Sequence, residues 1–197
     1  MSKKEKIILA TLDLASKYGL KSHSMSQIAE SVGIKKPSLY NHFDSKETLI
    51  KEMYAYIREK SKQATISQKP IFKPTDTAYT ILKNSVNSYK KMTTKREMLK
   101  FYKIVYAERT TNPDAAKIVI AETDKMVTAT KSLFKLLAQA GKFKLDNPDT
   151  AAITFSMTIH SLIDYELDHK IAKQKYDKKI VENYIKWFCN QYNKEEI

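Results

Sequence analysis

The sequence predicts an all-α protein, and three observations carry that prediction. Apolar residues recur every three or four positions along most of the chain, which is helical spacing. No stretch shows the alternating pattern of a half-buried strand. The 197 residues include only three glycines and five prolines, so there is little of the turn chemistry that tight hairpins need. The single cysteine, Cys189, makes an internal disulfide impossible and fits a reducing compartment.

The first part of the chain predicts four helices with recognisable ends. A helix is expected over residues 4–18, because Gly19 follows as the kind of residue that ends many helices in the left-handed conformation. Ser24, with a glutamine three residues later, forms a capping box that starts the second helix. Pro37 begins a short third helix, where its missing N–H costs nothing. Ser45 then caps a fourth helix.

The rest of the chain predicts a second helical domain. Residues 63–75 contain two prolines and several polar residues, and we interpret them as the break between domains. Helical spacing then predicts further helices over about residues 77–91, 95–109, 148–170 and 178–192, and, between the second and third of these, a long helix of about 25 residues that ends at Gly141. The expected organisation is about nine helices in two domains, residues 1–48 and 49–197.

The chain is strongly basic, with a formal net charge of +13 that is spread along its length. Such a charge favours an anionic partner such as nucleic acid or a membrane surface, although the lysine-rich faces could also simply be solvated. The apolar run after the N-terminal lysines faintly resembles a signal peptide, but charged residues interrupt it. No apolar run approaches the ~20 residues of a transmembrane helix. We therefore expect a cytoplasmic protein with no membrane partner.

The stretch from Ser24 to Ser45 carries the most information about function. Two helices that cross closely need a small residue where they approach, which is Ala29, and a short turn between them needs the positive φ that Gly33 permits. Leu39 of the following helix would close the joint. This is the arrangement of a helix-turn-helix, whose second helix enters the major groove of DNA. An ordinary helical hairpin with a solvated face is the alternative that the spacing leaves open.

The helix that would enter the groove has one apolar and one polar edge. Leu39 and Phe43 are four residues apart and should face the core. Asparagine pairs well with adenine, serine contacts several base edges, and tyrosine or lysine reaches phosphate. The side chains expected at the DNA from this pattern are Lys35, Lys36, Ser38, Tyr40, Asn41 and Lys46.

At these residues the sequence resembles the N-terminal domain of the TetR family of one-component regulators. The match runs from Lys4 to Ile50 without a gap, about a quarter of the chain. It ends in Leu-Tyr-Asn-His-Phe-x-Ser-Lys-Glu over residues 39–47, its most characteristic segment. Two positions depart from the family pattern: His23 stands where Thr or Ser is usual, and Ala15 replaces a frequent Phe.

The resemblance implies a sequence-specific DNA-binding transcriptional regulator, most often a repressor that a small molecule releases from its operator. It gives phosphate contacts to Ser24 and Ser26, base contacts to Lys36, Ser38, Asn41 and His42, and backbone clamps to Tyr40 and Lys46. It also implies a three-helix reading domain joined to a larger domain for effector binding and dimerisation.

The resemblance further implies a homodimer whose last two helices form a four-helix interface. The final helix supports this independently, because its apolar band is too wide for one buried face. Small residues in the preceding helix would permit close approach. The residues expected at the interface are Ala152, Ser156, Ile180, Tyr184, Trp187 and Phe188. A deeply buried terminal helix in a monomer is the alternative.

An effector pocket is expected in the second domain, as in other family members. The residues that could line it are Met98, Phe101, Tyr102, Val105, Met126, Phe134, Phe155 and Met157. The alternative is that they fill the core. Glu97, Glu108, Glu122 and Asp124 lie on the same helices, where an acidic group among aromatic rings would suit a cationic ligand. The sequence does not identify the effector, and we expect no cofactor.

A cluster of histidines and aspartates gives a weaker signal. His160, Asp164 and Asp168 are spaced four residues apart, with His169 adjacent, which permits a metal site or a polar seam but more often marks a solvated stripe. We predict no metal. Of the other function classes, a helical enzyme is disfavoured because no catalytic motif is present. A basic architectural or membrane-surface protein would bind DNA without regard to sequence.

Overall fold

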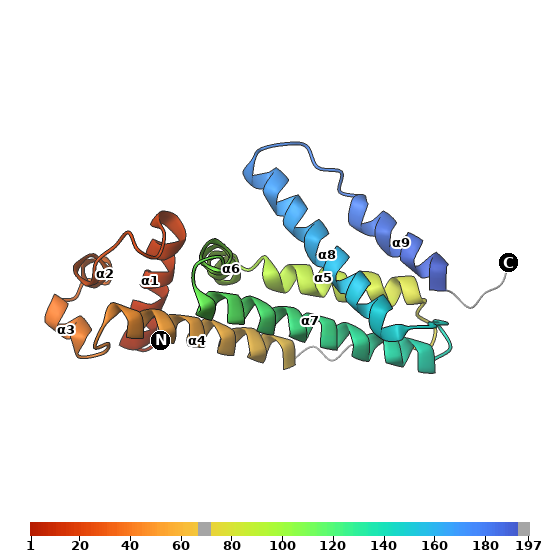
Figure 1. Ribbon diagram of the computed structural model, residues 1–197, viewed down its shortest axis with the longest axis horizontal. Helices are drawn as coiled ribbons and strands as arrows, with labels where there is room; N and C mark the ends of the chain where they lie inside the picture. Colours follow the sequence, from red (N-terminus) through yellow and green to blue (C-terminus); the bar gives the residue numbers. More distant parts are fainter. Residues whose placement is uncertain (67–71, 193–197) are drawn as a thin grey trace. The chain divides into compact units, whose positions relative to one another are not determined.

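The computed structural model describes residues 1–66 and 72–192, the side chains of residues 61–66 excepted (Figure 1). The regular structure of these residues is entirely helical, with no strand among them, and the predicted fold class is confirmed. The helices are α1 Lys3–Tyr18, α2 Met25–Ser31, α3 Lys36–Tyr40, α4 Lys46–Ile66, α5 Ala78–Thr93, α6 Arg96–Glu108, α7 Pro113–Gln139, α8 Pro148–Ile171 and α9 Ile180–Tyr192. Of the expected break at residues 63–75, residues 67–71 lie outside the described part of the chain.

The helix ends follow the local signals in the sequence. Ser24 caps α2, and the Ser24 Oγ accepts a hydrogen bond from the Gln27 backbone N–H at 3.3 Å, as the capping box predicts. Gly19 ends α1 with a φ of 86°, in the region that glycine occupies without strain. Ser45 caps α4 through a 3.1 Å hydrogen bond from the Thr48 N–H to its Oγ. These local interactions fix where α1 ends and where α2 and α4 begin.

Packing divides the chain into two compact units that the linear sequence does not keep separate. The first consists of residues 1–69 and 92–119, and the second of residues 70–91 and 120–197. The first unit therefore holds α1–α4, α6 and the beginning of α7, whereas the second holds α5, most of α7, α8 and α9. The expected boundary after residue 48 divides the chain by role, and it stays a prediction.

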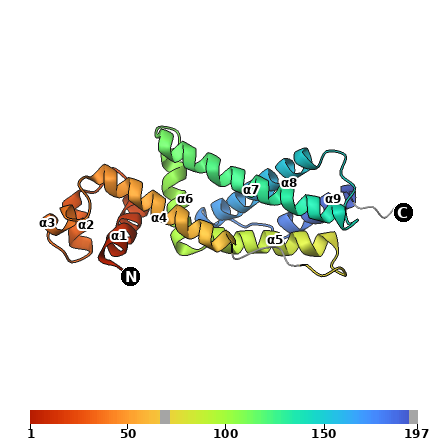
Figure 2. The ribbon, with the colours of Figure 1, turned by 90° about the horizontal axis from the view of Figure 1, so that it is seen from below.

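The core of the first unit joins α1, α4 and α6, with α2 packed on α1 and α3 on α2 (Figure 2). Its fully buried side chains come from all of these helices and from the segment between α3 and α4: Ile7, Leu12, Ile28, Leu39, Phe43, Leu49, Met53, Ile57 and Phe101. The short helices α2 and α3 thus share one core with the long α4. Burial on this core, rather than intrinsic propensity, is what keeps helices this short in place.

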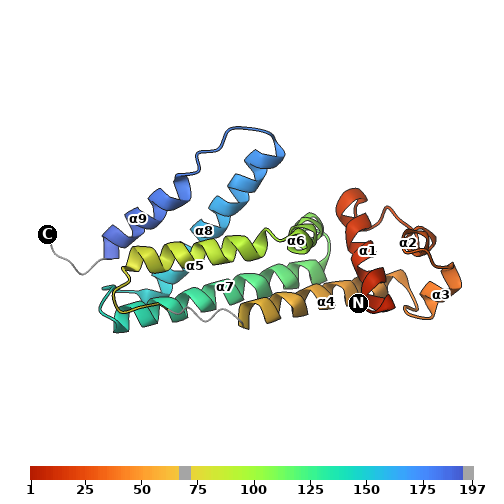
Figure 3. The ribbon, with the colours of Figure 1, turned by 180° about the vertical axis from the view of Figure 1, so that it is seen from behind.

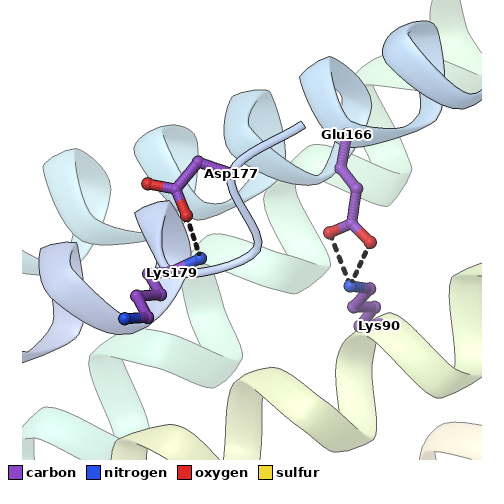
Figure 4. A network of polar contacts seen from close by, with 4 residues as sticks. All are labelled: Lys90, Glu166, Asp177 and Lys179. Carbon is purple, nitrogen blue, oxygen red and sulfur yellow. Dashed lines mark hydrogen bonds and ion pairs between the residues drawn. The ribbon is translucent and has the colours of Figure 1, made fainter. Parts of the chain in front are cut away.

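The core of the second unit is aromatic. Phe134 of α7, Phe155 of α8 and Phe188 of α9 have ring centroids 4.8–5.5 Å apart. The helices α8 and α9 lie side by side and run in opposite directions (Figure 3). At the surface of this unit Lys90 of α5 pairs with Glu166 of α8, with the Lys90 Nζ 2.7 Å and 2.5 Å from the two carboxylate oxygens (Figure 4). Among the described residues, no helix combines the length and apolarity that crossing a membrane would require.

Candidate nucleic-acid interface

The joint between α2 and α3 has the geometry that the sequence predicts. Ala29 is buried, and its carbonyl accepts a 3.0 Å hydrogen bond from the Ile34 N–H across the turn. Gly33 adopts a φ of 70°, and a Cβ placed on it would meet no atom within 4 Å. The backbone conformation, not a lack of space, therefore requires glycine at this position.

The helix α3 is anchored on one side and open on the other. Leu39 and Phe43 are 0% and 1% exposed and fix the helix to the first unit's core. The remaining side chains of this stretch are exposed: Lys35, Lys36, Pro37, Ser38, Tyr40, Asn41 and His42. The helix ends at Tyr40, although the Asn41 and Phe43 N–H groups still bond to carbonyls four residues back at 3.1 Å. A short helix with a continuous exposed polar edge can enter a major groove.

The start of α2 shows that Ser24 already has a structural role. Its hydroxyl lies 3.2 Å from the Gln27 Oε1 and accepts from the Gln27 N–H, so it is committed to the cap. Ser26 is exposed in the first turn of the helix. The phosphate contacts expected of these two serines stay predictions, and the one assigned to Ser24 would share its hydroxyl with the capping box.

Lys46 links the start of α4 to the residue just before the N-cap of α2. Its Nζ donates a 2.6 Å hydrogen bond to the His23 carbonyl, while the lysine stays half-exposed. The His23 side chain is only 5% exposed, and neither ring nitrogen has a hydrogen-bond partner among the described residues. Burial first, and the nearby Lys46 charge second, lower the pKa of His23 below its usual 6.5. The sequence marked His23 as unusual but gave no sign of this link.

Two family models match the chain. The model described as bacterial regulatory proteins of the tetR family matches residues 7–53, and the model of the AefR-like transcriptional repressor C-terminal domain matches residues 80–194, more than half of the chain. The chain belongs to the TetR family of transcriptional regulators. Members of this family are DNA-binding transcriptional repressors with ligand-binding C-terminal domains, so the predicted regulator function is confirmed and the enzyme and non-specific alternatives are not favoured.

Solved structures resemble the TetR-family chain over almost its full length. One described as a TetR-family regulator from Mesorhizobium loti has a TM-score of 0.71 at 20% identity, covering 97% of this chain and 96% of its own. A TetR-family regulator from Pseudomonas syringae has a TM-score of 0.68 at 18% identity, with 98% of each chain covered. The flavonoid-responsive regulator FrrA has a TM-score of 0.68 at 20% identity, again with 98% of each chain covered. A search of curated proteins finds no significant match.

Most of the residues expected to line an effector pocket are divided between the cores of the two units. Met98, Phe101 and Val105 are buried in the core of the first unit, and Tyr102 packs against it. Phe134 and Phe155 belong to the core of the second unit. The two remaining residues, Met126 and Met157, are half-buried and 41% exposed, respectively. The pocket as a whole stays a prediction, and five of its eight residues are core residues.

The residues expected at the dimer interface also separate into two groups. Ala152, Ser156 and Phe188 are at most 3% exposed within the single chain, and Ile180 and Tyr184 are half-buried. Trp187 alone is well exposed, at 56%, and its ring stacks on that of Tyr184 with centroids 5.9 Å apart. Apart from Trp187, the expected interface residues therefore contribute little to the accessible apolar surface of α8 and α9.

The histidines and aspartates of α8 make separate polar contacts. The His160 Nδ1 lies 2.9 Å from the Tyr89 hydroxyl of α5, and its Nε2 lies 3.6 Å from the Asp164 carboxylate. His169 instead contacts the Tyr165 carbonyl through its Nδ1 at 2.9 Å. In the described ranges no three His, Cys, Asp or Glu side chains are grouped so as to hold a metal ion. The contact between His160 and Tyr89 links α5 to α8.

Proposed function

We propose that this chain is a homodimeric repressor that reads a specific operator through α3 and leaves it when a small-molecule effector binds. The observation that carries the proposal is the polar edge of α3, which is exposed along its length while Leu39 and Phe43 hold its other edge in the core. A regulator of this kind acts where the DNA is, so the cytoplasm is its expected location.

The contacts proposed at the operator divide by chemistry. Ser38, Asn41 and His42, with Lys36, face base edges, where asparagine pairs with adenine and lysine with guanine. Tyr40 and Lys46, together with Lys35 and the start of α2, meet phosphates and set the register of the protein on the duplex. The Lys36 Nζ lies 5.9 Å from the Tyr40 ring centroid, so these two side chains share one end of the exposed edge.

The dimer is proposed to form through an apolar strip on α8 and α9. Ile153 and Met157 are 42% and 41% exposed and lie four residues apart, on one face of α8. Trp187 of α9 is 56% exposed, and large exposed aromatic residues are typical anchors of interfaces. This strip (Ile153, Met157 and Trp187) keeps Trp187 from the interface residues expected from the sequence and leaves out Ala152, Ser156 and Phe188, which are buried inside one chain.

Selection of bound DNA from a random pool tests operator reading. We expect one enriched motif, bound at least roughly 10³-fold more tightly than unrelated duplexes at physiological salt. Enrichment without a motif would instead indicate a basic protein that ignores sequence.

Sedimentation of Trp187→Glu tests the dimer. A buried charge in the strip should shift the protein towards monomer at micromolar concentration, because an unpaired charge opposes burial. Leu136→Glu changes another exposed apolar residue, 42% exposed on α7 outside the strip, and should remain dimeric like the parent protein. A Trp187→Glu protein that sediments as a dimer would contradict the proposed interface.

A further inference from the structure

On α4, two buried hydrogen-bond donors have no acceptor among the described residues. The Tyr54 side chain is 5% exposed, and its hydroxyl has no hydrogen-bond partner among the described residues. The Nε of the half-buried Arg58 is equally inaccessible and equally without a partner. Buried polar groups in proteins are nearly always satisfied, because an unpaired one carries a desolvation cost. Two such donors together indicate a group that the chain itself does not supply.

These two donors belong to one place in the fold. Tyr54 and Arg58 are four residues apart in α4 and therefore lie on one face of that helix. The Tyr54 ring meets Phe101 of α6 edge-on, with centroids 6.1 Å apart and planes at 75°. Met98 is buried in the same cluster, and Tyr102 packs against it. An occupant would thus meet aromatic and aliphatic groups as well as the two donors.

The charges near the Tyr54 hydroxyl differ from those near the Arg58 guanidinium. Burial raises the pKa of Tyr54 to about 12, and the carboxylates of Glu108 and Asp114 add to the effect, so the hydroxyl stays protonated and donates. Arg58 carries a permanent charge, and no carboxylate among the described residues forms an ion pair with it. A half-buried guanidinium without a counter-ion favours an anion, whereas the two carboxylates disfavour one near Tyr54.

We propose that Tyr54 and Arg58 are the polar anchors of the effector site, and that the effector is a small apolar molecule bearing a carboxylate. The carboxylate lies against Arg58, and a second oxygen of the ligand accepts from the Tyr54 hydroxyl. This inference rests on the proposed function, in which an effector controls operator binding. It differs from the cationic ligand suggested by the sequence, for which Glu97 and Asp124 are exposed whereas Glu108 and Glu122 are half-buried.

Calorimetric titration of the full-length protein without DNA tests the ligand class. The probes are benzoate, 4-hydroxybenzoate and hexanoate, and the neutral controls are benzamide and hexanamide. We expect at least one carboxylate to bind and its amide to bind at least about tenfold more weakly, because only the carboxylate pairs with the guanidinium. No heat from any of the three carboxylates, or equal binding of the amides, overturns the proposal.

Matched variants test the two anchors. Tyr54→Phe and Arg58→Gln should each weaken binding of the carboxylate by about tenfold or more, since each removes a donor to the ligand. Tyr54→Phe keeps the ring, and without ligand it should unfold at the same or a higher temperature, because it removes an unpaired hydroxyl. The Tyr54→Phe variant therefore still tests the proposal if Arg58→Gln does not fold. Arg96→Gln, which changes an exposed arginine of α6 in the same unit, should bind like the parent.

Two outcomes would refute the anchors, and neither depends on DNA. Unchanged carboxylate binding in both Tyr54→Phe and Arg58→Gln would place the ligand elsewhere. A crystal structure of the carboxylate-soaked protein with only ordered water on the Tyr54 hydroxyl and Arg58 Nε would show that solvent satisfies the donors. If the random-pool selection still yields an operator, either result refutes the ligand site alone and leaves operator reading intact.

Discussion

Replacing Lys46 by methionine should weaken both the first unit and its hold on DNA. The Lys46 Nζ donates to the His23 carbonyl at 2.6 Å and so ties α4 to the residue just before the N-cap of α2. A hydrogen bond from a charged donor contributes about 1.5–3 kcal/mol. Because Lys46 is half-exposed, the lower value applies, and the free energy of unfolding should fall by about 1.5 kcal/mol. For a chain of this size that corresponds to roughly 3–6 °C in the unfolding temperature.

The same substitution should change how DNA binding depends on salt. An ammonium group has three donors, and the bond to His23 uses one, which leaves two for a phosphate. Removing one ion pair between a lysine and a phosphate reduces the slope of log K against log salt by about 0.9. Fluorescence anisotropy with the selected operator and with an unrelated duplex should therefore show weaker binding to both, with a shallower slope.

Lys51→Met is the matched control for Lys46→Met. Lys51 is an exposed lysine of the same helix, five residues further on and outside the proposed contacts. It should change neither the unfolding free energy nor the slope at fixed protein concentration. If Lys46→Met is as stable as the parent, the bond to His23 contributes nothing in solution. If its salt slope is unchanged, the ammonium does not reach a phosphate.

Three further predictions concern α3 and the buried His23 before α2. Asn41→Ala should alter the selected motif at one base position while unrelated duplexes bind as before; an unchanged motif would remove Asn41 from the base contacts. Leu39→Ala, at a fully buried position, should lower the free energy of unfolding by about 2–5 kcal/mol in urea titration, and a decrease below about 1 kcal/mol would show that Leu39 does not anchor α3. Burial lowers the pKa of His23 below 6.5. The buried neutral imidazole therefore contributes fully to the free energy of unfolding above pH 6.5, and this contribution is lost as the pH falls through the folded-state pKa of His23. Between pH 7.5 and 5 the parent should therefore lose more unfolding free energy than His23→Gln, and equal losses would contradict this.

The elements that the sequence predicted well are those whose signals are local. Gly19 and the Ser24 capping box end or begin helices through bonds within a few residues, so their positions are readable without the fold. The Ala29–Gly33 joint is equally local, because a positive φ and a small contact residue are properties of single positions. The exposed polar edge of α3 followed directly from this joint.

The elements that the sequence missed depend on which neighbour a helical face meets. Periodicity correctly marked Phe101 and Phe155 as inward-facing, but it could not tell that they belong to separate cores. It suggested Met157 for a pocket, which stays a prediction, and it could not show that this side chain is 41% exposed on the same face of α8 as Ile153. The unpaired donors of Tyr54 and Arg58 could not be predicted for the same reason. A tyrosine in an apolar stripe gives no sign of whether its hydroxyl finds an acceptor.

A single helix connects the proposed ligand site with the DNA-reading head. Lys46 and Arg58 are twelve residues apart in α4, which is about 18 Å at 1.5 Å per residue. If a carboxylate weakens operator binding by some factor, the operator must weaken carboxylate binding by the same factor, because coupling between two bound ligands is reciprocal. Titrating the carboxylate with and without saturating operator measures one factor, and titrating operator with and without carboxylate measures the other. Equal factors above about threefold are expected for the parent protein. A carboxylate affinity that operator leaves unchanged would mean that a molecule binding at Tyr54 and Arg58 is not the effector, even if it binds there.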